Sequence, residues 1–194
     1  MTFIWPDFYK RTKDHPHWPL LERAVQLLGY KGHALDLGTG AGRDTRDLLS
    51  QGWHVTAVDS QPTSIEILRE LPQEHLRIVQ STFEDFDYEP ETYDLVSSQF
   101  SLPFNPKASF TSVFTRIKQS IKPGGIFTGQ FFGIHDEWNT PESNMTFLTR
   151  EQVNELLRDM TVIEFSEEDK IGPTASGNLK HWHVFHVIAQ KGAL

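Results

Sequence analysis

The 194-residue sequence contains no cysteine. Disulfide bonds, cysteine-ligated zinc and a cysteine nucleophile are therefore excluded, and this composition fits a reducing compartment. No apolar stretch approaches the roughly 20 residues that a membrane-spanning helix needs. Residues 1–7 lack the basic segment and apolar core of a signal peptide. We therefore expect a cytoplasmic protein without membrane attachment.

Positive charge is also scarce. The chain has 18 Lys and Arg against 26 Asp and Glu, a net charge of −8 at pH 7, and no run of basic residues. Proteins that bind nucleic acid usually gather such residues in a patch, so we expect no nucleic-acid partner. Hydrophobic residues make up 38% of the chain, including 14 Phe and 5 Trp, which is enough to predict a packed core.

Apolar periodicity predicts alternating strands and helices. Strands are expected at 33–37, 53–58, 75–79, 93–98 and 126–132, with helices at 16–28, 43–51, 60–71, 107–121 and after the capping box Thr149-x-x-Gln152. Residues 1–15 are expected to be irregular, and Asp14 is expected to cap the first helix. Two last strands, 161–169 and 180–190, flank a turn and predict an antiparallel hairpin. The order predicts an α/β fold with a doubly wound, mostly parallel sheet.

The rest of the chain is organised around the stretch from Ala34 to Asp44, where a buried strand stops in Gly38, Gly40 and Gly42 and a helix begins near Arg43. Glycine permits backbone angles that a Cβ would forbid and lets a ligand approach the main chain closely. The helix start offers free N–H groups and a positive dipole end. This pattern predicts a nucleotide-like cofactor at the carboxyl edge of a parallel sheet.

The spacing of acids around this loop indicates which cofactor binds. A dinucleotide fingerprint requires G-x-G-x-x-G, and Arg43 stands where its third glycine belongs, which argues against NAD or FAD. Asp36 lies at the strand end, where a carboxylate suits an ammonium group. Asp59 follows Gly38 by 21 residues and can accept both hydroxyls of a ribose. A ligand with an ammonium group and a ribose is S-adenosylmethionine.

The motif D-L-G-T-G-A-G followed by V-D resembles the first two motifs of the class I S-adenosylmethionine-dependent methyltransferases. The turn at residues 122–125 is similar to the one before strand five in that family, and the resemblance covers about residues 14–190. It implies a seven-stranded Rossmann-like sheet with a C-terminal antiparallel hairpin. From its length we expect a single domain, 1–194, with an N-terminal lid and helix at 1–30 and the core at 31–194.

The resemblance implies the cofactor contacts. Asp36, Gly38, Thr39 and Gly40 would take the methionine part, Asp59 the ribose hydroxyls, and Thr82 and Phe83 the adenine. Arg43 and Ser60 are further candidates for cofactor binding, although Ser60 and Gln61 could equally cap the next helix. Thr82 stands where many relatives have an acid. Either Glu84 or Asp85 therefore reaches the adenine amino group, or the backbone at Phe83 does. Ser98 and Gln99 follow strand four and would bond the cofactor's ammonium group or the substrate.

The aromatic and basic residues 7–15, the sequence Gly-x-Gly-Arg-x-Thr at 40–45 and Phe-Leu-Thr at 147–149 resemble the small tellurite-resistance-type methyltransferases. That likeness implies a thiol or chalcogen oxyanion as acceptor, a soft nucleophile that needs little or no general base. Expected acceptor-pocket residues are Phe8, Tyr9, Arg11, Gln99, Phe100, Phe104, Phe132 and Trp138. Tyr9, Arg43 and His135 are the candidate catalytic residues, and Arg43 or Arg11 could bind an anionic acceptor.

Nine histidines raise the question of a metal. On the last strand, His181 and His183 share one face and His186 lies on the other, so no convergent set is expected and no metal site is predicted. Residues 1–14 and 133–148 are expected to form a lid over a small-molecule acceptor. Two alternatives stay open: a cofactor-binding sensor or partner subunit without catalysis, and, more weakly, an NAD-dependent enzyme.

Overall fold

A computed structural model describes residues 4–192, and its centre is a mixed sheet in the order β3-β2-β1-β4-β5-β8-β7. The strands are β1 His33–Leu37, β2 His54–Asp59, β3 Leu76–Gln80, β4 Tyr93–Ser98, β5 Ile121–Gly133, β6 Phe147–Leu148, β7 Met160–Pro173 and β8 Leu179–Lys191. The helices are α1 Trp5–Thr12, α2 Pro19–Leu28, α3 Arg43–Ser50, α4 Pro62–Arg69, α5 Lys107–Ser120 and α6 Arg150–Leu157, with a short 3₁₀ turn, η1, at Leu102–Phe104.

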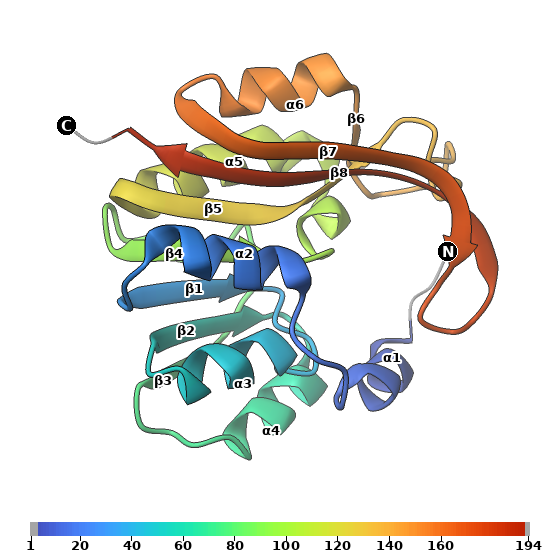
Figure 1. The fold of residues 1–194 in the computed structure, drawn as a ribbon. Coiled ribbons are helices and arrows are strands. Elements are labelled where there is room, and N and C mark those ends of the chain that lie inside the picture. Colours follow the sequence, from blue (N-terminus) through green and yellow to red (C-terminus); the bar gives the residue numbers. More distant parts are fainter. Residues whose placement is uncertain (1–3, 193–194) are drawn as a thin grey trace.

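Strands β1 to β5 are parallel, and β8 runs antiparallel between β5 and β7. The short β6 pairs with the end of β5, off the main order. This arrangement confirms the predicted α/β fold, a mostly parallel Rossmann-like sheet closed by an antiparallel hairpin (Figure 1). No helix in residues 4–192 has the length and apolar character required to cross a bilayer.

Side-chain alternation along the strands builds a core on each face of the sheet. Leu35 and Leu37 of β1 point to one face, where α5 and α6 supply Phe114 and Leu157. Ala34 points to the other face, which α2, α3 and α4 cover. In Figure 1, α2 and α3 lie in front of the sheet and α5 behind it. A sheet buried on both sides explains why its central strands read as continuous apolar runs.

The N-terminal region differs from the prediction. Residues 5–12 form helix α1, where an irregular segment was expected, with Pro6 in its first turn and Tyr9 buried. Helix α2 begins at Pro19 rather than near residue 16. Trp18 takes the capping position in an extended conformation, so the prediction that Asp14 caps this helix was wrong. The reason is local, because the residue before a proline is pushed out of the helical region.

The C-terminal hairpin is longer than predicted. The capping box before α6 is confirmed, since Thr149 and Gln152 exchange side-chain and backbone hydrogen bonds. Strand β8 pairs with β5 only as far as Phe132 opposite Val184. Beyond that pair, residues 169–183 continue as a two-stranded extension that we call the hairpin arm. The arm curves past the carboxyl ends of the parallel strands, on the side where α1 lies (Figure 1).

Candidate cofactor and acceptor site

The glycine loop follows β1 as the sequence predicts, and the backbone there requires glycine. Gly38 and Gly40 have φ angles of +73° and +56°, in the left-handed region that side chains disfavour. A Cβ on Gly38 would lie 2.4 Å from the Cβ of Ser101, and one on Gly40 would lie 3.3 Å from the ring of Tyr9. The loop is therefore held closely between the turn after β4 and helix α1.

Asp59 ties the loop to the end of β2. Its two carboxylate oxygens accept hydrogen bonds from the backbone N–H groups of Gly40 and Gln61, each at 2.9 Å. The hydroxyl of Tyr9 also bonds this carboxylate, and burial raises the pKa of both groups. The structure thus brings together Asp59, the loop and Tyr9, which come from distant parts of the sequence. Ser60 lies beside them on the surface.

Asp36 lies beneath the loop rather than on it. Its side chain is buried and accepts a hydrogen bond from the Thr45 hydroxyl at 2.6 Å. Burial, together with the nearby charge of Asp44, raises the pKa of Asp36 to about 8. Asp44 is buried too, accepts from the backbone N–H of Trp18 at 3.0 Å, and has its pKa raised by burial to about 6.

Arg43 brings a positive charge to this acidic group. Its guanidinium lies 3.9 Å above the ring of Trp18, and its Nε is 3.9 Å from a carboxylate oxygen of Asp44. Three buried carboxyl groups, those of Asp36, Asp44 and Asp59, thus surround the loop. Because desolvation penalises an ionised carboxylate, such a group favours a ligand that brings positive charge. Thr39 is buried here as well and bonds the hydroxyl of Ser64.

The residues of the loop after β3 that were predicted to contact the adenine differ in their distance from the glycine loop. Phe83 lies beside Gly38, with its ring 3.3 Å from where a Cβ on Gly38 would be. Thr82 instead closes a local turn, donating to the Asp85 carboxylate at 2.8 Å and accepting from its backbone N–H. Glu84 accepts from Ser109 of α5 at 2.9 Å. Phe83 is thus the member of this group that the structure brings to the glycine loop.

The segment after β4 carries Phe100, a predicted acceptor-pocket residue, in a strained backbone conformation that the sequence did not predict. Phe100 has a φ of +52°, uncommon for a bulky side chain and costing on the order of 1–2 kcal/mol. Its backbone N–H donates to the side chain of Gln130 at 2.8 Å, and Gln130 donates in turn to Gln99 at 2.9 Å. Ser98 is buried and bonds the hydroxyl of Ser101. No local sequence signal marks Gln130 as a partner.

An aromatic cluster stands next to this turn. Its members are Trp18, Phe100, Phe104, Phe132, Trp138 and Trp182. Phe100 and Trp18 are the tightest pair, with ring centroids 4.6 Å apart. Four members, Phe100, Phe104, Phe132 and Trp138, were predicted to line the acceptor pocket, whereas Trp18 and Trp182 were not assigned to it.

A buried ion pair, absent from the predictions, adjoins the cluster. Lys180 of the hairpin arm is 2% exposed and pairs with Asp136, which is also buried. The ammonium group of Lys180 lies 3.7 Å from the ring centroid of Trp138 and 4.0 Å from that of Trp182. Burial lowers the pKa of Lys180, and its bond to Asp136 opposes that shift. The aromatic faces and the carboxylate together hold one cation, as cation–π geometry favours.

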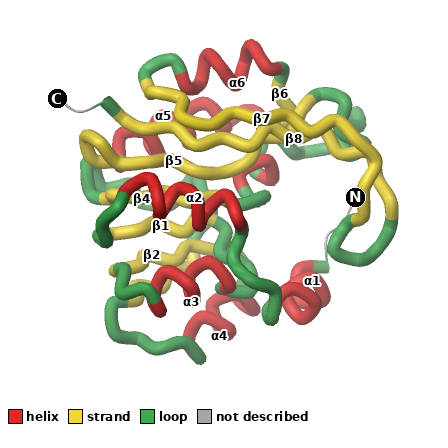
Figure 2. Tube along the Cα trace, in the orientation of Figure 1, coloured by secondary structure: helices red, strands yellow, loops and turns green. Residues whose placement is uncertain are grey.

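Helix α1 contacts both parts of the candidate site, the glycine loop and the aromatic cluster. Trp5 packs on Phe104 with ring centroids 5.0 Å apart, while Tyr9 reaches Asp59 and the glycine loop. The segment that connects α1 to α2 runs past the strand ends (Figure 2). Phe8 and Arg11 of the same helix are exposed rather than turned inward.

The structure does not bring His135 to the aromatic cluster. Its side chain is exposed and bonds Asp169 of the hairpin arm, and its ring stacks on that of His183. His183 and Trp182 are neighbours on β8, so their side chains point to opposite faces. His135 thus lies on the face of β8 away from Trp182, which argues against the predicted role of His135 in acid–base catalysis.

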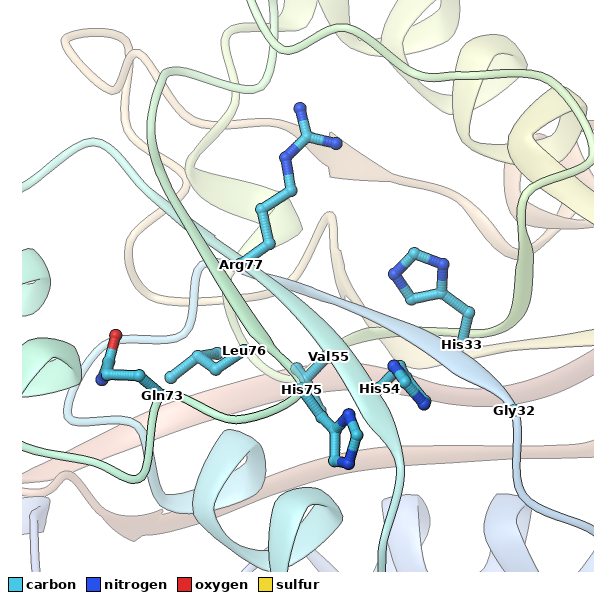
Figure 3. Close-up of a pocket in the computed structure, with 8 residues that line it drawn as sticks. All are labelled: Gly32, His33, His54, Val55, Gln73, His75, Leu76 and Arg77. Carbon is cyan, nitrogen blue, oxygen red and sulfur yellow. The ribbon is translucent and has the colours of Figure 1, made fainter.

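A hollow of about 480 Å³ lies elsewhere, at the amino ends of β1 to β3. Figure 3 shows His33 and Arg77 extending to one side of these strands and His75 to the other. Ligands of doubly wound sheets bind outside the carboxyl ends of the strands. This hollow is at the opposite edge and therefore does not belong to the cofactor site.

Comparisons with known proteins agree with the geometry. Residues 34–125 match a family model described as a methyltransferase domain, whereas a search of curated protein sequences returned no significant match. The fold is similar to that of a Burkholderia thailandensis 1,6-didemethyltoxoflavin-N1-methyltransferase solved with S-adenosylhomocysteine. That likeness has a TM-score of 0.70 and 23% identity, over 97% of this chain and 81% of that one.

Two further structures resemble the chain. TehB from Haemophilus influenzae has a TM-score of 0.78 and 20% identity, over 95% of this chain and 65% of that one. The N-methyltransferase NodS from Bradyrhizobium japonicum, in complex with S-adenosylhomocysteine, has a TM-score of 0.67 and 15% identity, over 96% and 97% of the two chains. By its sheet order, its glycine loop and the match over residues 34–125, the chain has the fold of the class I S-adenosylmethionine-dependent methyltransferases.

Proposed function

We propose that this protein transfers a methyl group from S-adenosylmethionine to a small-molecule acceptor. The observation that carries the proposal is the acidic lining of the glycine loop. Asp36, Asp44 and Asp59 are buried around it, each with a raised pKa, and Arg43 supplies one positive charge. S-adenosylmethionine brings two further cations, an ammonium and a sulfonium. An uncharged or anionic nucleotide would leave these carboxyl groups uncompensated.

The site residues fit the parts of that cofactor. The loop from Gly38 to Gly40 would hold the methionine part, with Asp36 beneath it, and Phe83 would pack against the adenine. Asp59 would accept the ribose hydroxyls, for which the Tyr9 hydroxyl must give way or share the carboxylate. The cofactor also needs no metal and no dinucleotide fingerprint, consistent with Arg43 at the third glycine position.

Methyl transfer to a soft nucleophile requires positioning more than proton transfer. The acceptor atom forms a bond to the methyl carbon while the carbon–sulfur bond breaks. The electron pair of the broken carbon–sulfur bond stays on sulfur, so the sulfonium of the cofactor becomes the neutral thioether of S-adenosylhomocysteine. Holding the two reactants in line supplies much of the rate. A thiolate or chalcogen oxyanion suits this site because it arrives ionised.

The aromatic cluster is the proposed acceptor wall. Phe100 and Phe132 are in ring contact, and Trp138 and Lys180 adjoin them. Flat apolar faces next to the cofactor loop would exclude water from the reacting atoms and favour an acceptor with apolar or aromatic parts. The comparison enzyme that acts on 1,6-didemethyltoxoflavin makes planar heterocycles a natural second group to screen.

Helix α1 is the proposed lid. It spans both halves of the site, because Trp5 contacts the aromatic cluster and Tyr9 contacts the loop. Removing residues 1–14 should therefore weaken cofactor binding and reduce turnover. Unchanged cofactor affinity and turnover in the truncated protein would refute the lid.

The cofactor assignment is tested by calorimetric titration with S-adenosylmethionine, S-adenosylhomocysteine and NAD in parallel. We expect micromolar binding of the first two and none of NAD. Asp59→Ala should weaken binding about 10- to 100-fold, because it removes two charge-assisted contacts that shape the loop. Glu74→Ala, which removes an exposed acid at the opposite edge of the sheet, is the matched control and should bind normally. Binding of NAD alone would overturn the proposal.

The acceptor is tested by following S-adenosylhomocysteine release with thiols, selenite, tellurite and planar nitrogen heterocycles. Turnover with any of them supports the enzyme. Tight cofactor binding without turnover on a broad panel would instead favour the alternative of a sensor or partner subunit.

A further inference from the structure

Away from the cofactor loop, histidines and carboxylates gather where the hairpin arm meets the segment after β5. One ligand atom each from His135, Asp169 and His183 can be chosen so that all lie within 4.8 Å of one another. His135 comes from the segment after β5, Asp169 from β7 and His183 from β8. Among residues 4–192 this is the only group of His and acidic side chains that meets this spacing.

We propose that His135, Asp169 and His183 bind a divalent transition-metal ion of the zinc type. Two imidazole nitrogens and one carboxylate oxygen are a ligand set that zinc accepts, with water completing four ligands. Zinc lies about 2.0–2.2 Å from such atoms. Tetrahedral ligand atoms are then roughly 3.3 Å apart, so a closing movement of at most about 1.5 Å per pair is needed.

The surroundings of His183 fit a metal ligand. Its Nδ1 accepts the backbone N–H of His135 at 3.1 Å, so Nε2 carries the proton and donates to Glu167 at 2.8 Å. Arg150 in turn pairs with Glu167. A ligating histidine usually donates its second ring N–H to a carboxylate, which fixes the ring and its tautomer. When the ion binds, Nδ1 of His183 would give up its hydrogen bond from the backbone N–H of His135 and coordinate the ion instead.

Asp169 is prepared in the same way. One carboxylate oxygen, Oδ1, bonds His181, while the other, Oδ2, is 2.9 Å from Nδ1 of His135. His181 would therefore orient the carboxylate and leave Oδ2 for the ion.

His135 is the ligand that has to move. Its ring stacks on that of His183 at 4.7 Å with a 20° tilt, and two stacked rings cannot both point a lone pair at one ion. His135 is 60% exposed, so its side chain can turn without disturbing the core. His183, by contrast, is held by Gly133, where a Cβ would lie 2.2 Å from its Nδ1.

The sequence prediction of no metal site considered the face shared by His181 and His183 but had no third ligand. The register of β7 against β8 sets Asp169 directly opposite His183, and the turn after β5 adds His135. A bound ion would therefore join the hairpin arm to the segment 133–148, on the face of β8 away from the aromatic cluster.

The test uses the full-length protein without an affinity tag, stripped with a chelator and titrated with Zn²⁺ by calorimetry and with Co²⁺ by absorption spectroscopy. We expect one equivalent to bind, and Co²⁺ to give the intense visible bands of tetrahedral coordination. His135→Ala and Asp169→Asn should abolish those bands. Glu167→Gln should weaken Zn²⁺ binding 10- to 100-fold while keeping them.

His54→Ala is the matched control, because it removes an exposed histidine at the opposite edge of the sheet. Circular dichroism of each variant confirms that it is folded. Bands and affinity that persist in both His135→Ala and Asp169→Asn would overturn the proposal, as would a weak octahedral spectrum in the parent protein. Neither readout depends on methyl transfer, so the test is independent of the proposed function.

Discussion

The raised pKa of Asp36 predicts that cofactor binding is coupled to proton release. In the free protein its carboxyl group has a pKa of about 8, because it is fully buried and close to Asp44. At neutral pH most molecules therefore hold a proton on Asp36. An ammonium group seated against this carboxyl favours the ionised form and lowers the pKa in the complex. Binding must then expel the proton.

The size of the effect follows from that pKa. When the group is ionised in the complex, the apparent Kd is multiplied by about 100 at pH 6 and by about 11 at pH 7, which is close to 1.4 kcal/mol per pH unit. Affinity for S-adenosylmethionine should therefore rise roughly tenfold between pH 6 and pH 7. Asp44, with a pKa of about 6, adds no more than about a factor of two across this range.

Calorimetry in two buffers of different ionisation enthalpy measures the proton directly. At pH 6.5 we expect release of about one proton for each cofactor bound. Asp36→Asn has the same shape without the titration, so it should bind more weakly and lose both the proton release and the pH dependence. A Kd that is equal at pH 6 and pH 7, with no buffer dependence, would refute the reasoning.

Three further outcomes follow from the packing. In the parent protein the Asp36 carboxyl has a higher pKa in the folded than in the unfolded state, so it binds more protons when folded and stability declines as the pH rises from 5 to 8. Asp36→Asn removes this group and should therefore reduce the fall in melting temperature over that range. Parallel curves for variant and parent would contradict this. Gly38→Ala should lower the free energy of unfolding by about 1–3 kcal/mol in urea titration, because its Cβ would collide with Ser101 in the turn after β4. Parent-like stability would show that the loop yields. Lys180→Met should cost about 3–5 kcal/mol in the same assay by leaving Asp136 buried without its cation, and a loss below 1 kcal/mol would mean that backbone donors suffice.

Much of the fold and the cofactor loop could be predicted because their signals are local. The glycines, Asp59 and the helix starts lie within a few residues of the strands that position them. The capping box at Thr149 is complete within four residues. The fold class then followed from the alternation of strands and helices, since parallel neighbours need crossover connections. Helix α1 was missed because a short aromatic segment with a proline resembles an irregular one.

The acceptor side could not be predicted, because its partners meet across long separations in sequence. Gln130 reaches Phe100 only through the register of β4 against β5. Lys180 and Asp136 lie 44 residues apart. A slip of one residue in either pairing would turn these side chains to the other face. The contacts of the hairpin arm could not be predicted because the sequence did not show how far the two strands extend.

The strain at Phe100 connects the two halves of the proposed site. Ser101, which follows it, donates to the backbone carbonyl of Leu37 at the end of β1, and the hydroxyl of Ser98 bonds that of Ser101, so both ends of the turn are held at the same point. Within this turn Phe100 is the residue that leaves the usual backbone regions. The cost, on the order of 1–2 kcal/mol, is offset by the hydrogen bond that the Phe100 backbone N–H donates to Gln130 and by the ring contact with Trp18. Because the same turn abuts Gly38 and carries Phe100 of the aromatic cluster, we expect a shift of the glycine loop to move Phe100 with it, which would couple binding at the loop to the shape of the proposed acceptor pocket.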